Sequence, residues 1–240
     1  MGKIINFIFV ICICLVILTG CNSDNNYSIE NKITEEIKYM ENSLIGIVNN
    51  FALENYYVQN DANNEAYGDV EFVTYDVDKI LEDTRKIEEA SNRIMVDLAT
   101  ENVDNKEITQ LSDGISKMIL TVSPDDEREY LVELNNVFSL FPNFEAKISS
   151  DSDEIFQRRV KYFTISSYIA FAVGDKNLAK TQVQTLESEY LEKQKSVEYV
   201  KEHKYNLNKI YLLIGELKKA IETDSITLVK EKYLLLINEI

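Results

Sequence analysis

The apolar residues of this chain recur at alternating spacings of four and three along most of its length. The first such stripe consists of Ile33, Ile37, Met40, Leu44, Ile47 and Phe51. This spacing places them on one face of a helix with 3.6 residues per turn. The chain also contains only seven Gly and two Pro, residues that β-rich folds use heavily in their turns. The sequence therefore predicts an all-α fold of long amphipathic helices joined by short loops.

Similar stripes predict helices over residues 29–57, 77–98 and 108–122. The polar segment 59–69 interrupts the pattern and is predicted to be a loop. Ser123 and Pro124 are typical of a helix start, because a hydroxyl caps the first amides and Pro fits the first turn. We expect the helix that they begin to be closed by Phe141 and Pro142.

In the C-terminal half, the acidic segment 151–154 predicts the start of a helix whose apolar residues cover a wide arc. Such a helix is expected to be buried on several sides. Gly174 predicts its end, and Asp175 predicts the start of the next helix. We place a break in the long stretch that follows near His203, and the start of the last helix at Asp224.

The predicted architecture is a helical bundle of about seven or eight helices. An arrangement as two packed sub-bundles of antiparallel hairpins, divided near Ser149, stays open. Small residues around Gly174 also leave tetratricopeptide-like hairpins as a weaker alternative. The predicted domains are a signal peptide (1–20), a tether (21–28), an N-terminal helical region (29–148) and C-terminal helical hairpins (149–240).

Residues 1–20 have the layout of a secretory signal peptide. Lys3 is followed by an apolar run from Phe7 to Leu18 and then by small residues. The run is shorter than the ~20 residues that a membrane-spanning helix needs. Cys12 and Cys14 lie inside it and would be removed with the signal, which excludes them as a metal or redox motif.

The end of this segment, Leu18-Thr19-Gly20-Cys21, resembles the lipobox of bacterial lipoproteins. The resemblance implies recognition of Leu18, Thr19 and Gly20, cleavage before Cys21, and acylation of its sulfur with palmitate or another fatty acid. Membrane attachment through Cys21 would place the mature chain on the extracytoplasmic face of the cell membrane. Residues 22–28 would form a short tether.

Two segments of the C-terminal half, 205–211 and 230–239, are similar to those of uncharacterised helical membrane lipoproteins of low-GC Gram-positive bacteria. Their shared residues are packing positions. The resemblance therefore implies a tethered helical protein and no catalytic residues.

The formal net charge of −16 becomes −17 once Lys3 is removed with the signal. An acidic body lacks the clustered Lys and Arg that nucleic-acid binding requires, so no nucleic-acid partner is expected. The same charge disfavours lying flat on anionic lipid.

The sequence carries few residues suited to catalysis. His203 is the only histidine, Cys21 is the only cysteine after the signal, and no glycine-rich phosphate loop is present. The acids at 125–127 and 151–154 are better explained as helix starts than as cation sites. We therefore expect no catalytic, cofactor-binding or metal-binding residues, and a non-enzymatic module that binds a protein or peptide. The alternatives are a small-molecule or cation-binding lipoprotein and, more remotely, an enzyme.

Overall fold

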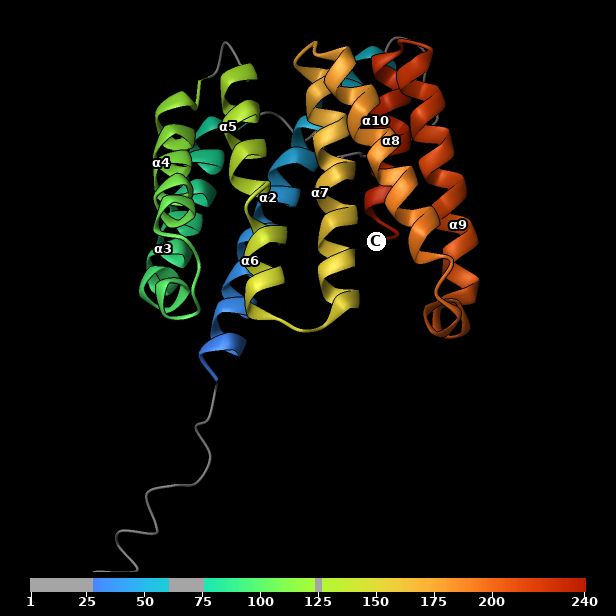
Figure 1. The fold of residues 1–240 in the computed structure, drawn as a ribbon. Helices are drawn as coiled ribbons and strands as arrows, with labels where there is room; N and C mark the ends of the chain where they lie inside the picture. The colour runs from blue at the N-terminus through green and yellow to red at the C-terminus, as the bar shows by residue number, and fades with distance from the viewer. Residues whose placement is uncertain (1–27, 61–75, 124–126) are drawn as a thin grey trace, which may run out of the picture.

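The structure, a computed structural model, describes residues 28–60, 76–123 and 127–240. These residues form nine helices and no strand (Figure 1). The helices are α2 (Ile29–Asn60), α3 (Val77–Thr100), α4 (Asn105–Thr121), α5 (Arg128–Phe138), α6 (Phe141–Ile148), α7 (Ser152–Ala172), α8 (Lys176–Lys193), α9 (Val197–Glu222) and α10 (Ile226–Ile237). The prediction of an all-α helical bundle is confirmed, with slightly more helices than expected.

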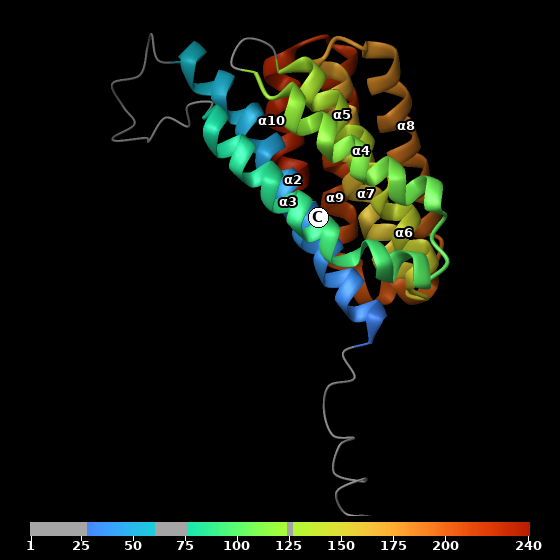
Figure 2. The same ribbon diagram turned by 90° about the vertical axis from the view of Figure 1, so that its left-hand side faces the viewer.

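Helices α2 to α5 pack as a series of neighbours, α2 on α3, α3 on α4 and α4 on α5 (Figure 2). The predicted stripe of α2 is the buried one, because Ile33, Ile37, Met40 and Leu44 are all inaccessible to solvent. The stripe of α3 is buried in the same way and includes Thr84, whose hydroxyl lies 2.9 Å from that of Tyr130 on α5. The spacing of apolar residues thus predicted the inner faces of both helices.

Helix α7 lies at the centre of the bundle, as its wide apolar arc predicts. It packs against α5 and α6 on one side and against α8 and α10 on the other. Helix α10 contacts both α9 and α7, so α7 to α10 close on one another. This closure differs from a tetratricopeptide stack, in which each repeat contacts only its neighbours along a superhelix.

Contacts among α2, α7 and α10 join the N-terminal and C-terminal helices. The rings of Tyr168 on α7 and Tyr233 on α10 stack with their centres 4.5 Å apart. The Tyr233 hydroxyl donates a hydrogen bond of 2.8 Å to Oδ1 of Asn49 on α2. Both tyrosines are buried, and the bond satisfies the polar end of Tyr233. The division of the chain near Ser149 into two regions stays a prediction.

Several predicted helix boundaries are confirmed. The Asp151 side chain accepts hydrogen bonds from the amides of Asp153 and Glu154 and caps α7. Gly174 follows α7 with φ +89°, a conformation that L side chains rarely adopt. Asp175 caps α8 by accepting from the amide of Leu178.

Three other boundaries were predicted wrongly. Phe141 and Pro142 do not close α5, which ends at Phe138; they begin α6, where Pro in the first turn costs no hydrogen bond. The break after α8 falls at residues 194–196, with Ser196 as cap, and α9 runs through residue 203 without interruption. Asp224 takes a positive φ of 59° between helices, and Ser225 caps α10 instead.

The remaining expectations for the N-terminal half fall partly outside the described residues. Helix α2 extends three residues beyond the predicted end at residue 57, and the predicted loop lies mostly within 61–75, outside the described residues. Pro124 also lies outside them, and α5 begins at Arg128, with no side-chain hydrogen bond capping its first turn.

Candidate functional site

Three charged side chains from three different helices are buried together. The exposed fractions are 2% for Glu41 on α2, 0% for Glu145 on α6 and 8% for Arg158 on α7. These helices come together at the end of the body where α2 begins (Figure 1). Charged groups are rarely buried so fully unless they are paired, so these three side chains are expected to bind one another.

Arg158 lies between the two buried carboxylates. Its Nη1 donates a hydrogen bond of 2.6 Å to Oε2 of Glu41, and its Nη2 lies 3.0 Å from Oε2 of Glu145. Lys161, one turn further along α7, donates a second bond of 2.6 Å to Oε1 of Glu41. Both oxygens of Glu41 are therefore occupied by cations. Glu145 is less well satisfied, because neither of its oxygens has a partner with good hydrogen-bond geometry.

A solvent-open pocket of about 400 Å³ lies over this buried group. Its residues from α2 are Asn31, Thr34, Glu35, Lys38 and Glu41, and those from α7 are Glu154, Gln157, Arg158 and Lys161. All of these residues are polar or charged. The pocket thus has a buried ionic floor and a rim of exposed charges and amides, an arrangement suited to binding a polar ligand.

Burial raises the pKa of Glu145 above its ordinary value. The loss of hydration is the largest cause, the positive charge of Arg158 opposes it, and the negative charges of Glu154 and Glu41 raise the pKa further. The carboxyl group of Glu145 therefore binds a proton more readily than that of an exposed glutamate.

The raised pKa of Glu145 predicts a dependence of stability on pH. The folded state holds the Glu145 proton more tightly than the unfolded chain, so the resulting stabilisation is complete below the unfolded pKa of about 4.5. This stabilisation is lost as the pH rises through the pKa that Glu145 has in the folded protein. Glu145→Gln, which stays neutral, should therefore gain stability relative to the natural chain as the pH rises above about 4.5. Urea unfolding at several pH values measures this difference.

Glu129→Gln is the control for this experiment, because Glu129 is an exposed acid in the first turn of α5. Its stability difference from the natural chain should change less over the same pH range. A difference between Glu145→Gln and the natural chain that stays constant with pH would contradict the assigned pKa shift.

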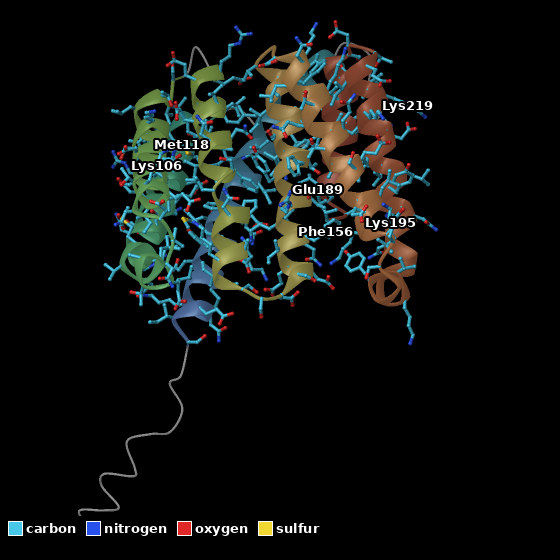
Figure 3. The ribbon with its side chains drawn as sticks, viewed as in Figure 1. Lys106, Met118, Phe156, Glu189, Lys195 and Lys219 are labelled. Carbon is cyan, nitrogen blue, oxygen red and sulfur yellow. The ribbon has the colours of Figure 1, made fainter. Side chains whose placement is uncertain are left out.

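A second cluster on α7 combines three aromatic rings with a lysine of the protein itself. Phe156 packs against Tyr190 and Tyr199, with ring centres 5.8 and 5.6 Å away, on the side of α7 that faces α8 and α9 (Figure 3). The Lys193 ammonium lies 4.7 Å from the centre of the Tyr199 ring and forms an ion pair with Asp153. A pocket of about 120 Å³ remains beside these rings. Because its cation is supplied internally, this cluster is better explained as packing.

The candidate residues singled out from the sequence either fall outside the described residues or cap helices. Leu18, Thr19, Gly20 and Cys21 fall outside the described residues, and so do Asp125 and Asp126. Among residues 28–60, 76–123 and 127–240, no three His, Cys, Asp or Glu side chains gather in a way that could hold a metal ion. Within those ranges, no helix is both long and apolar enough to cross a membrane.

The ionic site was missed although the sequence carries a signal for it. Glu41 lies four residues after Ile37 and three before Leu44, so it falls on the buried face of α2. Arg158 lies two residues after the buried Phe156 and two before the buried Val160, within the wide apolar arc of α7. A charge at an inward position marks a buried ion pair, but its partner cannot be identified until the helices are placed.

Comparison with protein-family models, with curated proteins and with solved structures finds no match to this chain.

Proposed function

We propose that this protein is a lipoprotein anchored to the outer face of the cell membrane, with a helical body that binds a protein or a peptide. The anchor rests on the lipobox-like segment ending at Cys21. Helix α2 begins at Ile29, so the tether of residues 22–28 spans at most about 25 Å at ~3.6 Å per residue. The body would therefore stay close to the bilayer.

The observation that carries the binding role is the charged pocket over Glu41 and Arg158. It is built on the first turns of α2, and would therefore lie at the end of the body nearest the anchor. Exposed amides and charges of both signs suit a polypeptide, which carries backbone amides and charged groups. Binding is favoured over catalysis because both oxygens of Glu41 are held by cations, which weakens it as a general base.

The alternative is a lipoprotein that binds a small molecule or a cation. It is supported by the pocket volume of about 400 Å³, which falls within the range of roughly 300–1,000 Å³ that small-molecule sites occupy. An enzyme is the more remote alternative, and the buried acids Glu41 and Glu145 are the groups on which it would depend.

Site-specific photo-crosslinking in intact membranes tests the proposed function. A photoreactive residue replaces Lys38 at the pocket rim or, as a control, the exposed Lys106 on α4, which is not one of the residues that line the pocket. We expect a discrete polypeptide adduct from position 38 and none from position 106. The absence of any adduct at position 38, together with stabilisation of the protein by a small molecule, would favour the alternative.

A further inference from the structure

The pocket offers hydrogen-bonding capacity that the protein itself does not use. Arg158 is more than nine-tenths buried in the floor of the pocket, and its two terminal nitrogens are already engaged by Glu41 and Glu145. Lys38 is exposed at the rim and forms no ion pair with any residue that the structure describes. The Lys38 ammonium can therefore bind an acceptor group of a ligand that enters the pocket.

The acceptor group cannot belong to a simple anion. The lining carries three acids and three bases, and the body as a whole is strongly negative. A bare anion would be repelled by this field and by Glu154, which is exposed at the same rim. A ligand that presents a carboxylate to the cations and an ammonium group to Glu154 avoids both penalties.

The spacing of the charges along α7 sets the length of such a ligand. Glu154, Arg158 and Lys161 lie on one face of the helix and all line the pocket. Glu154 and Lys161 are separated by about 10.5 Å along the axis, at about 1.5 Å per residue. An extended tripeptide spans about 10 Å, at ~3.3–3.6 Å per residue. A single amino acid is too short to reach both ends.

From these observations we propose that the pocket binds a short free peptide of about three residues. Its carboxylate lies toward Lys38 and Lys161, its ammonium group lies toward Glu154, and Gln157 contacts its backbone amides. The inference rests on the proposed peptide-binding function and adds the size and end groups of the ligand.

Calorimetric titration of the full-length protein, extracted from membranes in mild detergent, tests the proposal with trialanine as the probe. We expect binding of trialanine with free ends and a loss of about ten- to a hundredfold in affinity when either end is blocked, by N-acetylation or C-amidation. Alanine alone should bind at least tenfold more weakly. Equal binding of the acetylated peptide would overturn the proposal in favour of the C-terminus of a larger protein.

Matched substitutions test the location. Lys38→Gln and Glu154→Gln should each weaken trialanine binding about tenfold or more, and both positions are exposed, so the fold should be retained. The controls are Lys106→Gln, also an exposed lysine, and Glu129→Gln, which alters a first-turn acid of α5 just as Glu154→Gln alters one of α7. Unchanged affinity in the pocket variants, or equal losses in the controls, would overturn the assigned site.

The outcomes separate this inference from the function on which it rests. If trialanine fails to bind while position 38 still crosslinks to a polypeptide, the ligand class is wrong and the proposed function stands. If trialanine fails to bind and position 38 forms no adduct, both are wrong.

Discussion

Arg158→Met should lower the free energy of unfolding by about 3–5 kcal/mol at neutral pH. The substitution keeps most of the side-chain volume but removes the cation that lies between Glu41 and Glu145. Glu41 would retain Lys161, whereas Glu145 would lose the guanidinium that lies 3.0 Å from it while remaining fully buried. A buried carboxylate without its counter-charge is the main cause of the expected loss.

Arg159→Met provides the control, because it is the same substitution one residue further along α7. The Arg159 side chain is 47% exposed and forms an ion pair with Glu189 on α8. Glu189 is labelled in Figure 3. An exposed ion pair of this kind contributes about 0–1 kcal/mol. Urea unfolding of both variants measures the difference. Similar losses in the two would show that the buried position of Arg158 has no special role.

A triple variant tests the cause of the Arg158 effect. Glu41→Gln and Glu145→Gln, added to Arg158→Met, remove the buried carboxylates as well as the cation. Part of the lost stability should return, because replacing a whole buried ionic group is often close to neutral whereas removing one member is not. A further loss in the triple variant would contradict this explanation.

Cys21→Ala should abolish fatty-acid labelling and release the protein from the membrane. The expected physical reason is that acyl chains stabilise the membrane-bound state by about 0.8 kcal/mol for each buried CH₂ group, and that two or more chains anchor a protein stably. The strongly acidic body has no comparable affinity for anionic lipid. Metabolic labelling with a radioactive fatty acid and membrane fractionation give the two measurements.

Cys12→Ala and Cys14→Ala are the matched controls for Cys21→Ala. Both cysteines lie in the apolar run before the predicted cleavage site, so their loss should leave labelling and fractionation unchanged. A Cys21→Ala variant that is still labelled and still processed would contradict lipidation at this residue and, with it, the proposed location.

Much of the fold could be predicted because helix formation depends on local spacing. The buried faces of α2 and α3 follow directly from apolar residues three and four positions apart, and the burial of α7 on several sides follows from its wide apolar arc. The caps at Asp151 and Asp175 were likewise predicted, because a side chain that caps a helix bonds to amides only two or three residues away. Each of these features is decided within a few turns of the chain.

The boundaries that were predicted wrongly share a different cause. Residues 194–196 contain neither Gly nor Pro, so no strong local signal marks the break between α8 and α9. Pro142 is compatible with both the end of one helix and the start of another. In both places several local conformations are close in energy, and packing selects among them.

The sequence by itself determined the helical class of this protein, the inner faces of α2 and α3, the burial of α7 on several sides and the signal-like segment that ends at Cys21. Each depends on residues close together in the chain. Only the tertiary structure brought Glu41, Glu145 and Arg158 together, because Glu41 and Arg158 are 117 residues apart in the sequence. The attraction between buried charges acts across space and not along the chain, so the ionic site and the pocket over it became visible only once α2, α6 and α7 were packed.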